Sequence, residues 1–261
     1  MPPHPGMRSP VHDALEVVTI SLDAAFDTVR AAAVLSRDER RRADRFARER
    51  DRRRFIVSRA QLRELLGARL RVPPEHVEFV YGPAGKPALA TRFGGTGLRF
   101  NVSHCDGIAA FAFTIGRDIG IDIEAVRALP DADAVASLVF SPEEQATYRA
   151  LEVRDRPLGF FNCWTRKEAF VKAIGDGLRY PLDRFEVSLT PGEPPRLLRI
   201  DSTPGSRTGW RLHAFVPAPG LIGAVAVRTR TYGSGMTMRP RFVVHAPSGA
   251  DAGTTVPPGD D

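Results

Sequence analysis

A six-residue alternation near the middle of the chain places the strongest constraint on its fold. Every second residue of Ile119-Gly120-Ile121-Asp122-Ile123-Glu124 is isoleucine. Successive side chains of a strand point to opposite faces, so the isoleucines share one face while the glycine and the two acidic residues share the other. The segment is therefore predicted to be a strand with an apolar back and an acidic front.

The two acidic side chains of this strand suggest a cation site. A rise of about 3.3 Å per residue separates Asp122 and Glu124 by roughly 7 Å along the strand. Carboxylates suit a hard cation such as Mg²⁺, and two like charges side by side are unfavourable without one. A solvated strand face is the alternative interpretation of the same pattern.

A second segment, residues 158–174, has the periodicity of a helix and is followed by Gly175. Glu168 and Lys172 are four residues apart on its flank, a spacing that is also typical of a surface salt bridge. Lys167 falls inside an apolar arc, which consists of Phe160, Trp164, Val171 and Ile174. A lysine in such an arc either extends to solvent or reaches a ligand at the edge of the core.

The remaining pattern mixes helices and strands. Residues 36–71 have helical spacing, with Ser36 as the N-cap and Glu39 at capping-box distance, and a further helix is expected after the cap Ser141. The other predicted strands are residues 77–81, 98–103, 108–115, 185–189, 210–216, 221–228 and 241–245. We therefore expect an α+β fold in two halves that join near residues 117–119.

Composition sets the expected boundaries. Both ends of the chain are rich in Pro, Gly, Ser and Thr, which is typical of chain termini outside a packed core. We expect a flexible N-terminus over residues 1–13, an N-terminal half over 14–118, a C-terminal half over 119–231 and a disordered tail over 232–261.

Positive charge is concentrated in one segment. Residues 37–71 contain 14 arginines and six acidic residues, a net charge of +8, whereas the whole chain has +6 and the rest therefore has −2. It should attract a phosphorylated small molecule or a polyanion, which makes a nucleic-acid-binding protein the rival class. Because the segment includes six acidic residues and lacks an RNP-like aromatic motif, we expect no nucleic-acid partner. Only three of the 37 basic residues of the chain are lysines: Lys86, Lys167 and Lys172.

Other classes are excluded by what the chain contains. Its two cysteines, Cys105 and Cys163, form no C-x-x-C pair, which argues against a disulfide scaffold and a structural zinc site. The apolar stretches fall far short of the ~18 residues of a membrane helix, and the N-terminus lacks the apolar core of a signal peptide. We expect a cytoplasmic monomer with no membrane partner.

Four motifs in a fixed order resemble those of the 4′-phosphopantetheinyl transferase superfamily. They are Gly85-Lys86-Pro87, Phe100-Asn101-Val102-Ser103-His104, the alternation at residues 119–124, and a block over residues 161–178 with Trp164, Lys167, Glu168 and Lys172. The two-halved length resembles the surfactin-synthetase-type (Sfp-like) branch. The resemblance covers roughly residues 15–230.

The resemblance implies a fold and an activity. The fold is a pseudo-twofold pair of similar α+β halves with the active site between them. The activity is Mg²⁺-dependent transfer of the 4′-phosphopantetheine arm of coenzyme A to a serine of an apo acyl or peptidyl carrier protein, with release of 3′,5′-ADP. Carriers of polyketide, nonribosomal peptide and fatty-acid synthesis are all candidates.

The resemblance also implies roles for individual residues. Asp122, Glu124 and Glu168 are implied as metal ligands, Glu144 as a further acidic active-site residue, and Lys172 as a contact to phosphate. Glu168, Glu144 or a metal-bound water would take the serine proton. The residues implied in coenzyme A binding are Arg53, Lys86, Pro87, Ser103, His104 and Lys172, together with Arg40 and Arg42 of the basic segment.

Overall fold

The computed structural model describes residues 15–83, 85–175, 180–200, 209–229 and 241–245. The helices in these ranges are α1 (Thr28–Ala33), α2 (Arg37–Ala43), α3 (Glu49–Leu70), α4 (Ala132–Val139), α5 (Pro142–Ala150) and α6 (Arg156–Ile174). The strands are β1 (Glu16–Ser21), β2 (Phe79–Tyr81), β3 (Pro87–Leu89), β4 (Leu98–Cys105), β5 (Ile108–Ile115), β6 (Ile119–Ala125), β7 (Phe185–Val187), β8 (Leu197–Ile200), β9 (Trp210–Phe215), β10 (Leu221–Arg228) and β11 (Arg241–His245). Short 3-10 helices span Pro74–His76, Thr91–Thr96 and Leu182–Arg184.

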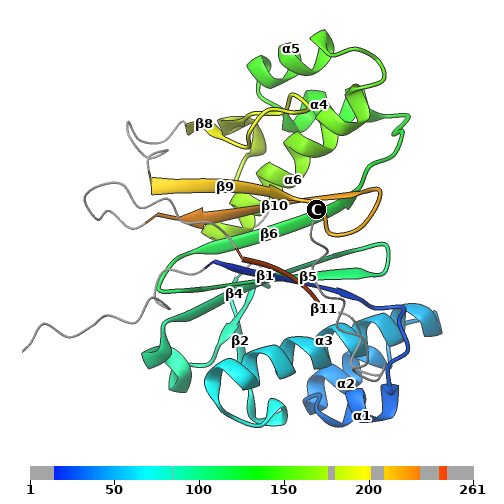
Figure 1. Ribbon diagram of the computed structural model, residues 1–261, viewed down its shortest axis with the longest axis vertical. Coiled ribbons are helices and arrows are strands. Elements are labelled where there is room, and N and C mark those ends of the chain that lie inside the picture. Colours follow the sequence, from blue (N-terminus) through cyan, green and yellow to red (C-terminus); the bar gives the residue numbers. More distant parts are fainter. Residues whose placement is uncertain (1–14, 84, 176–179, 201–208, 230–240, 246–261) are drawn as a thin grey trace, which may run out of the picture.

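Two sheets lie face to face in the middle of the molecule, and helices cover their outer sides (Figure 1). The sheet with strand order β11-β1-β5-β4 is covered by α1–α3, and the sheet with order β6-β10-β9 by α4–α6. The predicted α+β class and the organisation into two halves are confirmed. Within the described residues, no helix is both long and apolar enough to cross a membrane.

The alternation in β6 determines how the two sheets meet. Ile119, Ile121 and Ile123 are buried in a core between the sheets, against Ala110 and Ala112 of β5. These alanines are small, so the backbones of the two sheets approach closely. Because side chains alternate, the acidic front of β6 faces away from this core and toward α6.

Most predicted helix boundaries are confirmed. Ser36 and Glu39 form the expected capping box of α2, and Ser141 forms a second one at the start of α5. Helix α6 ends at Gly175, whose φ of 87° is in the left-handed region that favours glycine. The helical segment predicted over residues 36–71 consists of two helices, α2 and α3. The sequence does not reveal the break between them, because residues 44–48 contain no Gly or Pro.

The predicted strand at residues 241–245 is β11, and it pairs in parallel with β1. Glu16 lies opposite Arg241, so the end of the chain returns to complete the sheet of the N-terminal half. The expectation of a disordered tail from residue 232 is therefore wrong for these five residues. The composition of residues 232–261 as a whole pointed to disorder, and although the strand itself was predicted, its pairing with β1 depends on a contact between distant segments.

Candidate active site

Gly120 allows α6 to lie directly against β6. A Cβ at this position would lie 2.9 Å from the carbonyl carbon of Lys172, and closer still to the Ala169 oxygen and the Ala173 nitrogen. Because no side chain separates the helix from the strand, residues on the near face of α6 reach the acidic front of β6.

Asp122 is the buried centre of this site, with 3% of its surface exposed. The ammonium of Lys172 lies 2.5 Å from Asp122 Oδ1, and the Ser103 hydroxyl donates to the same oxygen at 3.0 Å. Asp122 Oδ2 is buried and has no hydrogen-bond partner among the residues that the structure describes. Burial raises the pKa of Asp122, while Lys172 and Ser103 act to lower it. Because Asp122 is buried, the alternative interpretation of the β6 pattern as a solvated strand face does not hold at this residue.

Two more carboxylates share the site with Asp122. Burial raises the pKa of Glu168; the charge of Lys172 lowers it and that of Asp122 raises it. Burial raises the pKa of Glu124, and the negative charge of Asp122 raises it further. The Glu124 carboxylate accepts a hydrogen bond from the Trp164 side chain. The lysine predicted as a surface partner of Glu168 is instead paired with Asp122 on β6. The structure thus brings together three of the predicted acidic residues and Lys172.

This donor set suits a hard cation. Two buried carboxylate oxygens, Asp122 Oδ2 and Glu168 Oε1, have no partner in the described residues, and Mg²⁺ favours carboxylate oxygens. As the side chains stand, the described residues include no group of three or more His, Cys, Asp or Glu that could hold a metal ion. Coordination by Asp122, Glu124 and Glu168 together would therefore require their side chains to turn toward one another.

The N-terminal half contributes to the site through β4. Asn101 Oδ1 accepts a hydrogen bond from the Ile121 amide at 2.9 Å, and Ser103 Oγ accepts one from the Ile123 amide at 3.4 Å. These bonds align β4 with β6 across the two halves and hold Ser103 against Asp122. Sequence reasoning assigned no role to Asn101, although its two-residue spacing from Ser103 places both on one face of the strand.

Glu144 and Lys167 lie in the core of the C-terminal half and are not brought to this site. The Lys167 ammonium lies 2.7 Å from Glu144 Oε2 and donates to two main-chain carbonyls. Glu144 also accepts hydrogen bonds from the amides of Ser141 and Val187, so both of its oxygens are used. Lys167 is 1% exposed, so it takes neither route predicted for a lysine in an apolar arc.

Two of the residues predicted to bind coenzyme A line a hollow of about 270 Å³ at the end of β4. His104 and Arg42 both line it, and the Arg42 guanidinium lies over the Phe55 ring. Arg54, which sequence reasoning missed, also lines the hollow and forms an ion pair with Asp23. This arrangement places cationic and aromatic side chains one residue beyond Ser103 along the strand.

The other predicted basic contacts are more dispersed. The guanidinium of Arg53 donates to the Ala24 carbonyl at 2.6 Å, and Arg40 is exposed on α2. Two further arginines of the basic segment are used inside the fold, since Arg59 and Arg63 both pair with buried Glu39. Part of the positive charge that suggested a polyanion partner is therefore neutralised internally.

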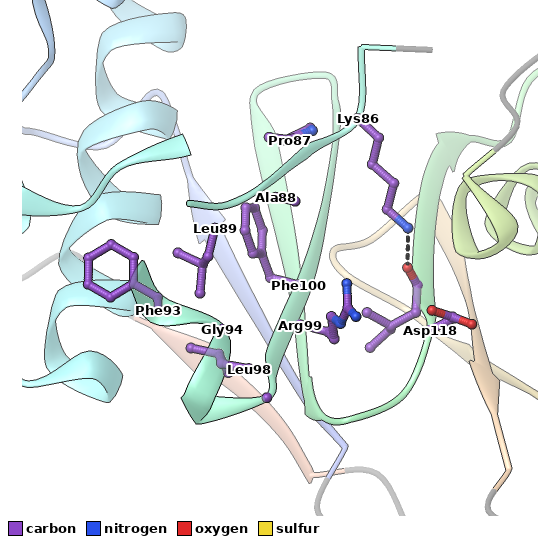
Figure 2. Close-up of a pocket in the computed structure, with 12 residues that line it drawn as sticks. Lys86, Pro87, Ala88, Leu89, Phe93, Gly94, Leu98, Arg99, Phe100 and Asp118 are labelled. Carbon is purple, nitrogen blue, oxygen red and sulfur yellow. Dashed lines mark hydrogen bonds between the residues drawn. The ribbon is translucent and has the colours of Figure 1, made fainter. Parts of the chain in front are cut away.

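Lys86 and Pro87 line a second hollow, of about 180 Å³, at the opposite end of β4 (Figure 2). Figure 2 shows the Lys86 side chain reaching from the turn before β3 to the carbonyl of Ile119. Burial lowers the pKa of Lys86 to about 8; the nearby Asp118 opposes this effect and Arg99 adds to it. The ammonium is bonded to main-chain carbonyls rather than directed into open space.

Comparison with known proteins agrees with this architecture. Residues 118–218 match the family model of the 4′-phosphopantetheinyl transferase superfamily, and residues 24–115 match that of the 4′-phosphopantetheinyl transferase N-terminal region. The chain is 38% identical over 241 residues to the 4′-phosphopantetheinyl transferase HetI of Nostoc sp., covering 92% of this chain and 96% of the relative. It is 29% identical to a 4′-phosphopantetheinyl transferase of Bacillus subtilis, covering 61% of this chain and 69% of the relative.

A solved structure, the holo-[acyl-carrier-protein] synthase (AcpS) of Thermotoga maritima, also matches, with a TM-score of 0.31 and 21% identity. The match covers 42% of this chain and 62% of that protein. The fold and the carboxylate–lysine cluster describe a two-halved α+β protein with an acidic site between a strand and a helix. The sequence relatives then give its family: this chain belongs to the 4′-phosphopantetheinyl transferase superfamily.

Proposed function

We propose that this enzyme transfers the 4′-phosphopantetheine arm of coenzyme A to a serine hydroxyl of an apo acyl or peptidyl carrier protein. The serine oxygen bonds to the β-phosphorus, the bond from that phosphorus to the bridging oxygen breaks, and 3′,5′-ADP leaves. The observation that carries the proposal is the cluster of Asp122, Glu124, Glu168 and Lys172 between β6 and α6. Two of its buried carboxylate oxygens have no hydrogen-bond partner within the described part of the chain. The two-halved architecture favours the surfactin-synthetase-type branch.

The residues of the cluster would have different roles in the transfer. Asp122, Glu124 and Glu168 would hold Mg²⁺, which when bound supplies a Lewis acid next to the pyrophosphate. Lys172 is held beside Asp122 by an ion pair and lies within 3.4 Å of the Ser103 hydroxyl. From there its ammonium would stabilise charge on the transferring phosphoryl group.

Glu168 is the proton acceptor that we favour for the serine hydroxyl. Its Oε1 is buried next to the cluster and has no partner in the described residues, whereas Glu144 uses both oxygens inside the core. The proton would pass from the serine oxygen to the Glu168 carboxylate as the new bond to phosphorus forms.

The hollow lined by Arg42, Arg54 and His104 would take the nucleotide end of coenzyme A. Guanidinium groups suit phosphate because they offer several N–H donors in a fork, and the Phe55 ring supplies an apolar surface. A bound 3′-phosphate would compete with Asp23 for Arg54. Cys105 also lines the hollow and shares a face of β4 with Ser103, so a nucleotide in the hollow would direct its pyrophosphate along that face toward Asp122.

Intact-mass measurement with apo carriers tests the proposal. The enzyme, coenzyme A and Mg²⁺ should add one phosphopantetheine arm to at least one polyketide, nonribosomal peptide or fatty-acid carrier, and the carrier with its acceptor serine changed to alanine should gain nothing. Asp122→Asn should lower the rate by at least about 100-fold, the scale for loss of one electrostatic contact to the reacting group. Asp131→Asn, at an exposed aspartate, is the matched control. No mass gain on any carrier class would refute the proposed reaction, and a wild-type rate for Asp122→Asn would refute the assignment of this carboxylate.

A further inference from the structure

Lys86 links the N-terminal half to both elements that carry the acidic cluster. Its Nζ donates to the carbonyl of Ile119 at 3.0 Å, of Lys172 at 2.5 Å and of Ala173 at 3.3 Å. Ile119 is the first residue of β6, and the other two residues belong to the last turn of α6. One ammonium therefore fastens the strand that bears Asp122 to the helix that bears Lys172.

The last turn of α6 is a favourable place for a cation. The final carbonyls of a helix lack intrahelical donors and form the negative end of the helix dipole. The Gly175 amide bonds to the Val171 carbonyl, which leaves the carbonyls of Lys172 and Ala173 for Lys86. Because an ammonium has three N–H donors, these three carbonyls use the full donor capacity of Lys86.

The backbone that carries Lys86 is also fixed in place. Gly85 has a φ of 76°, in the left-handed region that favours glycine. The Lys86 carbonyl accepts a hydrogen bond from the Gly82 amide at 3.0 Å, and Pro87 starts β3 directly afterwards. Lys86 thus directly precedes β3 of the β2–β3 hairpin, and Figure 2 shows its side chain extending toward Asp118, the residue before β6.

We propose that Lys86 is a positioning residue, which locks α6 onto β6 and so keeps the Lys172 ammonium within hydrogen-bond distance of Asp122. The role rests on the proposed function and differs from the contact to coenzyme A that the resemblance implies for this lysine. A direct contact would require Lys86 to give up at least one of its carbonyl partners.

Kinetics of Lys86→Met test this role, because methionine keeps much of the apolar stem and removes all three donors. We expect kcat for phosphopantetheine transfer to fall by about 10- to 100-fold, the loss expected when a catalytic group is misplaced by up to ~1 Å. KM for coenzyme A should stay within about threefold. The control is Arg99→Met, which removes a positive charge from the same hollow and should leave both constants unchanged. A raised KM with an unchanged kcat would overturn the proposal in favour of direct binding, and wild-type constants would overturn it outright.

Amine acylation of the wild-type protein provides a second test that needs no variant and no activity. The chain has only three lysines, so peptide mass spectrometry can follow each one. Lys172, with 30% of its side chain exposed, is the reactive reference, and Lys167, at 1%, is the protected reference. We expect Lys86 to react at least about tenfold more slowly than Lys172 in the absence of coenzyme A, and we expect the rate at Lys86 itself to be unchanged when coenzyme A is added. Rapid reaction that coenzyme A suppresses would overturn the proposal, whether or not the proposed transfer is observed.

Discussion

The close packing of α6 on β6 makes Gly120→Ala a decisive perturbation. Alanine adds one methyl group, which would lie 2.9 Å from the Lys172 carbonyl carbon and nearer still to two further backbone atoms of α6. Ordinary contact begins at 3.4 Å, and the largest overlap is the one with the Ala169 oxygen, so the helix must move away from the strand by about 1 Å or more. No rotamer change can relieve the overlap, because all three neighbouring atoms are backbone.

The expected effect on stability follows from this overlap. An added methyl group in a packed core typically costs about 1–3 kcal/mol, and contact with rigid backbone favours the upper end. With a urea m value of about 3 kcal/mol/M, a loss of about 3 kcal/mol lowers the unfolding midpoint by about 1 M. Catalysis should suffer more, since a displacement approaching 1 Å costs about 100-fold in rate.

Urea unfolding and carrier-modification kinetics measure the two effects in the same preparations. Gly95→Ala is the matched control, because no atom of the described residues lies within 4 Å of a Cβ at that position. Both its midpoint and its rate should equal those of the wild type. If Gly120→Ala unfolds at the wild-type urea concentration and retains the wild-type kcat, the inference that this glycine sets the distance between α6 and β6 is wrong.

Two further substitutions test the charged groups. Glu39→Gln should lower the free energy of unfolding at pH 7 by about 3–5 kcal/mol, because it leaves a buried arginine, Arg63, without its charged partner. Burial raises the pKa of Glu39, but Arg59 and Arg63 outweigh burial and hold it below the usual 4.5. The ionised carboxylate therefore stabilises the fold fully above about pH 4.5, and urea midpoints of variant and wild type should converge as the pH falls below that value. Lys172→Arg keeps the charge but should lower kcat by at least about tenfold, because a guanidinium cannot occupy the position of a compact ammonium. Steady-state kinetics measure this effect, and a kcat near that of the wild type would contradict the reasoning.

The parts of the site that could be predicted were those with a local periodicity. Alternation over residues 119–124 correctly separated the face that packs between the sheets from the face that carries Asp122. Helical spacing placed Glu168 and Lys172 on one side of a helix that ends at Gly175. Neither pattern required knowledge of a tertiary contact, because side-chain direction in a strand or helix follows from the backbone alone.

The parts that could not be predicted depend on contacts between distant segments. Nothing local indicates that Asn101 bonds to the backbone of β6, or that β11 pairs with β1. The role of Glu144 shows the same limit. The family resemblance marked it as an acidic active-site candidate, but only the tertiary fold shows that Lys167 neutralises it within the core.

The three lysines of this arginine-rich chain occupy sites of one kind, where several acceptors converge on a single nitrogen. Lys86 meets three carbonyls, and Lys167 meets the Leu182 and Phe185 carbonyls and the Glu144 carboxylate at 2.6–2.7 Å. Lys172 meets Asp122 and Ser103. An ammonium directs three donors from one small centre, whereas a guanidinium spreads five donors over a plane and fits acceptors that lie side by side. Arginine at any of these positions would force the converging acceptors apart. The acceptors around Lys86 and Lys172 are backbone and side-chain groups of the proposed active site, so their displacement would change the geometry of that site.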